Sequence, residues 1–310
     1  MTLPPLPADA RVLAVDVGGT TLKAEVLDGR SQVLATGVER TPLGDDALGA
    51  VSRLGSRLID QVEAQGHGPV SRAGLALPGI VDRASGVGVF SANVGWRDLE
   101  FGPPLERSWN MAVLVDHDVT IAGWAEWKVG AAQRCDDMFF VGLGTGVAAS
   151  IVAGGHLLRG GLTQAGELGH VVVRPGGALC GCGNRGCLEA ICSASSIART
   201  YASASGRQVD SAADVVSALD DDPVAAHVWD EALSALADGL LNVVNLLSPR
   251  IIVLGGGLAG AGDALVKPLS KKMTARARFV PVPDIVCGTF GAQAAVMGAG
   301  LLALCGAAED

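Results

Sequence analysis

Apolar residues recur every three or four positions in two segments of the chain, which is the spacing of one face of an α-helix. The stronger pattern lies between residues 223 and 247, and the other lies between residues 46 and 65. We predict an amphipathic helix for each segment, with its stripe in the core or, for the longer one, at a dimer surface. The apolar positions are Trp229, Leu233, Leu236, Leu240, Val243 and Leu247 in the longer segment, and Leu48, Val51, Leu54, Leu58 and Val62 in the shorter.

Short apolar runs bounded by glycine, proline or polar residues predict strands between these helices. Further helices are expected over residues 193–204 and 291–304, a loop over residues 91–96, and an irregular leader over the proline-containing residues 1–10. The predicted strands are residues 11–16, 24–27, 74–80, 111–115 and 251–254, a segment near Ile285, and two strands within residues 139–150.

The composition is that of a globular protein. The chain has 310 residues, of which 49% are hydrophobic and 18% charged, so it can bury the core of two domains or of one large domain. The absence of a run of about 18 apolar residues excludes a membrane span. The formal net charge of −9 disfavours a general affinity for nucleic acid. Seven cysteines without a recognisable secretory signal fit a reducing compartment, and we expect the cytoplasm.

One histidine and three cysteines lie close together in the chain, as His170-x9-Cys180-x-Cys182-x4-Cys187. One imidazole and three thiolates are the ligand set of a closed structural zinc site, which leaves no position open for a reacting water. The cysteines are alternatively buried thiols or disulfide partners. The many glycines of the segment suit a backbone wound tightly around an ion, and we therefore predict structural zinc.

Two carboxylates, Glu167 and Glu189, flank the predicted metal loop. Each is explained equally well as surface charge. A rigid loop that holds two carboxylates near one another is also a suitable frame for binding neighbouring hydroxyl groups of a polyol.

Two strand–turn–strand segments carry glycine in the turn. The first, residues 16–23, reads Asp-Val-Gly-Gly-Thr-Thr-Leu-Lys, and the second has glycines at 142, 144 and 146. Both are typical of simple β-hairpins. The small residues of the first also let backbone N–H groups and hydroxyls face a phosphate, while Asp16 can hold a magnesium ion through water. The segment lacks the sequence of a Walker loop.

Asp118 follows the strand predicted at 111–115 and precedes a helical segment. It is expected either to cap that helix or to act as a general base. Phosphorylation of an alcohol needs a base that accepts the hydroxyl proton, and a carboxylate at the carboxyl end of a strand is suitably placed.

These motifs resemble those of the ROK family, which contains bacterial sugar kinases and related repressors. The resemblance is most specific in Glu167-Leu168-Gly169-His170 followed by residues 180–189, CGCGNRGCLE, and it extends to residues 16–23, DVGGTTLK. It implies a two-domain α/β fold of the actin-like (ribonuclease H-like) kind with a structural zinc loop. We place the smaller domain at residues 1–115 plus 292–310 and the larger one, with the zinc loop, at 116–291.

The resemblance also implies ATP-dependent phosphorylation of a hexose, with Mg²⁺ and structural Zn²⁺, in a homodimer or a dimer of dimers. Asp118 falls on the catalytic aspartate of the family. The sugar would be bound by Asn93, His117, Asp118, Glu167, His170 and Glu189. The nucleotide would be bound by Asp16, Gly18, Gly19, Thr20, Thr21, Lys23, Gly144, Thr145, Gly146, Gly256 and Gly257.

The sequence departs from the family pattern E-N-D-A-N, because His117 and Thr120 stand where that pattern has asparagine. An imidazole also offers two nitrogens, but with a different reach. The sugar is therefore left open, and a cyclitol or an N-acyl amino sugar is the alternative acceptor. Polyphosphate is an alternative donor. Two other classes are a non-catalytic sugar sensor and a repressor, and ten residues before the first strand are too few for a helix-turn-helix.

Overall fold

The computed structural model describes residues 10–308, so most of the leader expected at residues 1–10 lies outside the described residues. The chain forms two compact units. Unit 1 runs to Lys128 and resumes at Gln293, and unit 2 runs from Val129 to Ala292. No helix within residues 10–308 combines the length and the apolar character needed to cross a bilayer.

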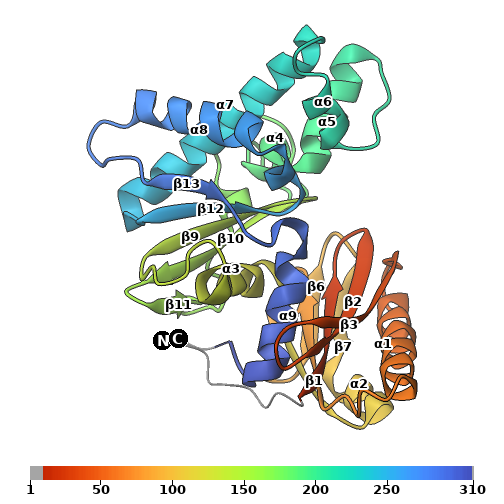
Figure 1. Ribbon diagram of the computed structural model, residues 1–310. Coiled ribbons are helices and arrows are strands. Elements are labelled where there is room, and N and C mark those ends of the chain that lie inside the picture. Colours follow the sequence, from red (N-terminus) through yellow and green to blue (C-terminus); the bar gives the residue numbers. More distant parts are fainter. Residues whose placement is uncertain (1–9, 309–310) are drawn as a thin grey trace. The chain divides into compact units, whose positions relative to one another are not determined.

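Unit 1 is built on a five-stranded sheet in the order β3-β2-β1-β4-β8 (Figure 1). β1 pairs antiparallel with β2 and parallel with β4, and β4 pairs parallel with β8. A second, three-stranded antiparallel sheet has the order β5-β6-β7. The strands are β1 (Arg11–Val17), β2 (Thr21–Asp28), β3 (Val33–Arg40), β4 (Arg72–Leu77), β5 (Ile80–Asp82), β6 (Val87–Ser91), β7 (Trp96–Glu100) and β8 (Ala112–His117).

Helices cover both faces of the larger sheet. The helices are α1 (Asp46–Ala64), α2 (Gly102–Trp109), α3 (Asp118–Val129), whose last residue falls in unit 2, and α9 (Ala294–Cys305), which follows a 3₁₀ turn at Gly291–Gln293. Side chains alternate between the two faces of a strand. Leu13 accordingly lies against Gly55 of α1, while the next residue, Ala14, lies against Gly300 of α9. β1 is thus buried on both faces.

α3 belongs to unit 1 because it packs closely against α9. A Cβ atom added to Gly298 of α9 would lie 2.4 Å from the carbonyl oxygen of Ile121 in α3, so only glycine permits this approach. The domain boundary expected at residue 115 falls inside unit 1, between the middle of β8 and the start of α3.

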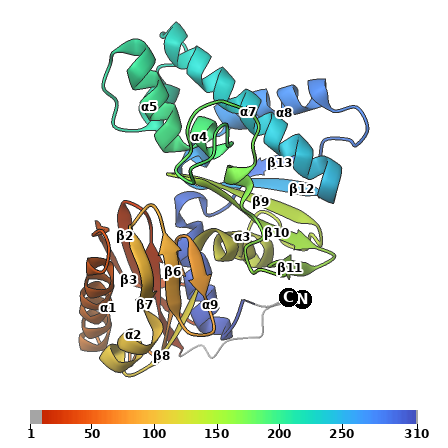
Figure 2. The same cartoon turned by 180° about the vertical axis from the view of Figure 1, so that it is seen from behind.

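Unit 2 has a five-stranded sheet in the order β11-β10-β9-β12-β13, visible from the other side in Figure 2. β9 is antiparallel to β10 and parallel to β12, and β12 is parallel to β13. The strands are β9 (Met138–Leu143), β10 (Val147–Ala153), β11 (His156–Leu158), β12 (Ile251–Gly255) and β13 (Asp284–Cys287). The helices are α4 (Glu189–Cys192), α5 (Ala194–Ser205), α6 (Ala212–Ser217), α7 (Pro223–Leu247) and α8 (Asp263–Arg276), with 3₁₀ turns at Leu168–His170 and Gly257–Ala261.

α7 is the helix predicted from the longer apolar stripe, and five of the six stripe positions, from Trp229 to Val243, are buried in the core of unit 2. Leu247, at its end, is 41% exposed. The stripe is therefore core within the chain. The alternative, a dimer surface along this stripe, is not needed to cover it.

Candidate active site

Asp16, Ala76 and Asp116 stand in one row across the sheet of unit 1. Ala76 pairs with Asp16 of β1 on one side and with Asp116 of β8 on the other. The three strands are parallel, so this row marks their common carboxyl end, which is where open α/β sheets bind ligands. Asp118 follows the row by two residues, at the start of α3.

Burial raises the pKa of both carboxyls predicted to act at this edge. Asp16 is only 8% exposed, and its pKa rises to about 7 because of burial first and the charge of Asp118 second, while Lys23 opposes the rise. The pKa of Asp118 is also raised by burial, and nearby His117 opposes that rise. Carboxyls with such altered pKa values gather at functional sites.

The turn after β1, predicted to be a phosphate loop, is closed by hydrogen bonds at Gly18. Gly18 donates its N–H to the carbonyl oxygen of Thr21 at 3.0 Å, and a Cβ at Gly18 would lie 2.8 Å from that oxygen. Thr41, which the sequence gave no reason to single out, donates its hydroxyl to the Gly18 carbonyl at 2.7 Å. Gly19 and Thr20 form the bend, and Lys23 of β2 pairs with Asp16 and donates to Gln293 at 3.3 Å.

The segment after β8 differs from the expected helix cap. Asp118 accepts a hydrogen bond from the N–H of Val119 at 2.6 Å, but the N–H of Thr120 points to Nδ1 of His117 at 3.4 Å. His117 therefore occupies the capping position that was the alternative role for Asp118. Asp116 is fully buried and is held by Arg83, whose Nε lies 3.0 Å from its Oδ2.

Asn93 lies exposed in the turn between β6 and β7. The turn is held by the N–H of Gly95, which donates to the carbonyl of Ser91 at 2.8 Å, and by Gly44, which donates to Val94 at 2.8 Å. Residues 91–96 were expected as a loop, but only residues 92–95 form the turn, because Ser91 ends β6 and Trp96 begins β7.

In unit 2 the predicted nucleotide glycines come together at one end of the sheet. Gly144 and Gly146 close the β9–β10 hairpin, with the N–H of Gly144 donating to the carbonyl of Gly146 at 3.0 Å. Gly256 follows β12 with φ of +78°, and a Cβ there would lie 2.5 Å from the carbonyl oxygen of Leu143. Exposed Thr145 lies in the hairpin, and Gly257 begins the next 3₁₀ turn.

The helix α5 begins beside this hairpin, which the sequence did not indicate. The N–H of Ala194 donates to the carbonyl of Gly144 at 2.9 Å, and the hydroxyl of Ser195 donates to the carbonyl of Thr145 at 2.7 Å. These contacts fix the hairpin between the sheet and the first turn of α5.

The four predicted metal ligands converge. One ligand atom from each of His170, Cys180, Cys182 and Cys187 lies within 4.8 Å of all the others. Nδ1 of His170 is 3.7 Å from Sγ of Cys180, and the sulfurs of Cys182 and Cys187 are 3.8 Å apart. Zinc–sulfur bonds of about 2.3 Å in a tetrahedron place sulfurs about 3.8 Å apart. The donor set therefore fits a zinc ion.

Two of the three thiols of this loop, Cys180 and Cys187, are in surroundings that oppose their ionisation. Burial and the neighbouring thiols raise the pKa of Cys187 to about 12, and burial raises the pKa of Cys180. A hydrogen bond from the backbone of Asn184 lowers the pKa of Cys182. Three adjacent thiolates repel one another, so a bound metal ion would be needed to hold all three.

The predicted hydroxyl ligands of unit 2 lie beside the metal loop. Nε2 of His170 faces away from the cluster, 3.8 Å from Oε2 of Glu167. Glu189 begins α4 and accepts a hydrogen bond from the N–H of Val147 at 2.9 Å, which ties it to β10. Gly169, between Glu167 and His170, lets this segment lie close to β10 and α4. A Cβ there would lie 2.1 Å from the carbonyl oxygen of Val147 and 3.2 Å from Cβ of Glu189.

A model of the ROK family matches residues 12–305 of the chain. The chain belongs to the ROK family. A glucokinase of Halalkalibacterium halodurans is 33% identical to it over 318 residues, covering 95% of each chain. The resemblance inferred from the zinc loop and the glycine turn is therefore confirmed.

Solved structures of ROK proteins share the fold. A ROK family glucokinase from Streptomyces griseus, in complex with glucose and AMPPNP, superposes with a TM-score of 0.81 at 28% identity, covering 95% of this chain and 99% of that one. A ROK hexokinase from Thermus thermophilus gives a TM-score of 0.75 at 30% identity, covering 94% and 97%. The chain thus has the mixed α/β fold of ROK glucokinases.

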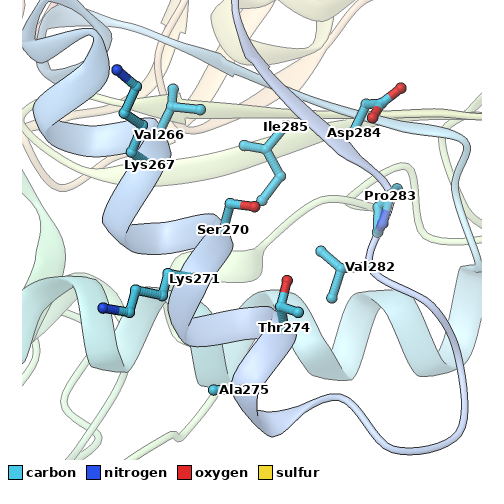
Figure 3. Close-up of a pocket in the computed structure, with 10 residues that line it drawn as sticks. All are labelled: Val266, Lys267, Ser270, Lys271, Thr274, Ala275, Val282, Pro283, Asp284 and Ile285. Carbon is cyan, nitrogen blue, oxygen red and sulfur yellow. The ribbon is translucent and has the colours of Figure 1, made fainter.

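A cavity of about 750 Å³ in unit 2 has no part in this site (Figure 3). It is lined by α8 from Val266 to Ala275 and by residues 282–285. None of the predicted site residues lines it. It lies where β13 begins, whereas Gly256 lies where the parallel strand β12 ends, so the two are at opposite edges of the sheet.

Proposed function

We propose that this ROK protein transfers the γ-phosphoryl group of ATP to a hydroxyl group of a hexose, in the manner of a glucokinase. The observation that carries the proposal is the position of Asp118, a partly buried carboxylate just beyond the carboxyl end of the parallel strands in a ROK family fold. The kinship with glucokinases, and with a structure that holds glucose and AMPPNP, supports a hexose and ATP as the substrates.

In the proposed reaction Asp118 accepts the proton of the attacking hydroxyl as that oxygen bonds to the γ-phosphorus. The bond between the γ-phosphorus and the bridging oxygen breaks, and ADP leaves with the electron pair. The turns at Gly18 and Gly19 and at Gly144 through Gly146 would hold the phosphates, with the hydroxyls of Thr20, Thr21 and Thr145 and the ammonium of Lys23. The N–H groups of Gly18 and Gly144 close these turns, so the backbone donors to the phosphates would be the other N–H groups of the turns. Gly256 and Gly257 would let the adenosine lie against bare backbone.

The residues at the sheet edge also fit Mg²⁺, which would neutralise charge on the transferred phosphoryl group. Asp16 would hold the ion through water, because its carboxylate lies at the end of β1, beside the predicted phosphate turn. Its pKa of about 7 means that the carboxyl is readily ionised when a cation is bound.

Specificity for the sugar would come from the predicted hydroxyl ligands. Asn93 and His117 with Asp118 are assigned from unit 1, and Glu167, His170 and Glu189 from unit 2. His170 would bind zinc through Nδ1 and turn Nε2 to a sugar oxygen, so zinc would position the acceptor without entering the reaction. Unpaired buried polar groups are costly, which lets such a set discriminate between hydroxyl patterns.

The proposal also includes a cellular location and an assembly. The seven cysteines all lie within residues 10–308 as free thiols, and the cytoplasm is the proposed location. A homodimer or a dimer of dimers is the proposed assembly, and sedimentation of the purified protein measures it directly.

The substrate is tested by measuring phosphorylated product from ATP with a panel of hexoses, N-acyl amino sugars and cyclitols. Glucose or a close epimer is expected to give the highest kcat/KM. If a cyclitol or an acylated amino sugar gives a higher kcat/KM, that class replaces the hexose as the proposed substrate. If no compound of the panel causes release of ADP, a non-catalytic sugar sensor is favoured.

The base is tested by Asp118→Asn. Loss of the proton acceptor is expected to lower kcat by about 10²- to 10⁴-fold, while binding of the sugar stays measurable by calorimetry, since the amide keeps the shape of the carboxylate. Asp82→Asn, at the exposed end of β5, is the control and should keep wild-type rates. A near-normal kcat in Asp118→Asn would refute the assignment.

A further inference from the structure

His117 and Thr120, which stand where the family pattern has asparagine, contact one another. Nδ1 of His117 lies 3.1 Å from the hydroxyl oxygen of Thr120, and it lies 3.4 Å from the N–H of the same residue. The spacing of three residues across the start of α3 brings them together. His117 and Thr120 therefore act as one structural unit rather than as two independent substitutions.

The other nitrogen of the ring faces the base. Nε2 of His117 lies 3.2 Å from Oδ1 of Asp118, and the two side chains are similarly accessible, at 21% and 22%. Both ring nitrogens of His117 thus have partners within the segment 117–120. Because both nitrogens are engaged here, His117 is assigned a different role below, which replaces the sugar ligand proposed above.

The partners of Nδ1 determine where the ring carries its proton. A backbone N–H can only donate, so Nδ1 must accept from Thr120, and the threonine hydroxyl can donate to the same nitrogen. In the neutral ring the proton is then on Nε2, which faces Asp118. The ring can therefore donate to Oδ1 of Asp118, which also accepts from the N–H of Val119 at 2.6 Å.

We propose that His117 is a positioning residue for the base: Thr120 fixes its ring, and Nε2–H holds Oδ1 of Asp118 so that Oδ2 meets the acceptor hydroxyl. The inference rests on the proposed kinase function. It adds a role that the asparagine of the family pattern does not have, because the shorter amide does not reach the position of Nε2. The start of the segment is itself fixed, because the N–H of His117 donates to buried Asp116 at 2.8 Å.

A matched pair of variants separates the two ring nitrogens. The amide of glutamine reaches the position of Nε2, and that of asparagine reaches the position of Nδ1. His117→Gln should keep kcat within about threefold, whereas His117→Asn should lower kcat by about ten- to a hundredfold with an unchanged KM for the hexose, since a misplaced catalytic group costs that much. Thr120→Val should lower kcat in the same direction and Thr120→Ser should not.

Two kinetic outcomes overturn the proposal. A raised KM with unchanged kcat in His117→Asn would make the ring a sugar ligand, and wild-type kinetics in both His117 variants would leave it without a role. Thermal melts identify a variant that fails to fold, in which case the Thr120 pair decides.

A measurement that needs no kinase activity keeps the proposal separate from the function. In ¹⁵N-histidine-labelled protein, the ring signals of His117 are those missing from His117→Gln. They should show an unprotonated Nδ1 and a protonated Nε2, and Asp118→Asn should shift the Nε2 signal. A protonated Nδ1 would overturn the proposal even in an active kinase, while an inactive wild-type protein would refute the proposed function alone.

Discussion

At the residue scale, Asp16 shows how a residue proposed to hold Mg²⁺ can oppose folding. Its carboxyl is buried at the end of β1, and its pKa rises from 3.8 to about 7. The folded state therefore holds the proton more tightly than the unfolded state does. Stability contributed by this group is fully present below about pH 4, and it is lost as the pH rises towards 7, where the buried carboxyl must ionise.

Asp16→Asn removes this cost because the amide carries no charge at any pH. In urea unfolding without Mg²⁺, the variant is expected to exceed the wild type in stability at pH 8, by at most ~4 kcal/mol from about 1.4 kcal/mol per pKa unit. The difference should shrink at pH 5, and kinase activity should be lost. A variant less stable than the wild type at pH 8 would show that the carboxylate is not strained by burial.

At the element scale, the metal loop is held by its own turns and by α7. Gly186 has φ of +78°, and its Cα packs so closely under Arg174 that a Cβ would lie 1.6 Å from the Arg174 carbonyl oxygen. Arg174 in turn donates to Asp238 of α7 at 2.7 Å, and Asp238 accepts from Arg276 of α8 at 2.7 Å. The loop that carries His170 is thus connected to the core helices of unit 2.

Cys182→Ser tests whether zinc holds this loop. The wild-type protein is expected to contain about one zinc per chain by elemental analysis, and the variant should lose it together with part of the ~10 kcal/mol that a structural zinc can contribute to folding. Cys287→Ser, outside the loop, should keep both the metal and the melting temperature. Zinc-free wild-type protein of full stability would contradict the prediction.

At the scale of the whole molecule, the last helix returns to the first sheet and meets α3, the helix that begins at the proposed base, Asp118. α9 packs on β4 so closely that a Cβ at Gly74 would lie 2.0 Å from the carbonyl oxygen of Ala299. Gly298 of α9 approaches α3 almost as closely, with 2.4 Å from an added Cβ to the carbonyl oxygen of Ile121. The position of Asp118, at the start of α3, therefore depends on residues at the end of the chain.

Gly298→Ala should force α3 and α9 apart, because the atom it meets is backbone and cannot rotate away. A loss of about 1–3 kcal/mol in urea unfolding is expected, with a lower kcat as Asp118 shifts. Gly49→Ala in α1 meets only the flexible end of Arg53, at 3.2 Å, so it should be neutral or gain up to about 1 kcal/mol. Equal stabilities for the two variants would argue against the close contact.

The sequence by itself determined the features that depend on residues close together in the chain. The period of 223–247 predicted α7, the glycine turns predicted their hairpins, and the His–Cys spacing placed four ligands that do converge. Each of these features is encoded within a few dozen consecutive residues, where the geometry of a helix, a turn or a metal tetrahedron fixes the permitted spacing.

Tertiary structure alone decided which distant residues meet. Arg83 pairs with Asp116, Thr41 holds Gly18, and Ser195 holds Thr145, across separations that no local period encodes. The role of His117 was local but also hidden, because its ring orientation depends on which atoms of Thr120 and Asp118 the start of α3 turns towards it. Sequence spacing restricts which side chains share an element, whereas packing between elements chooses their partners.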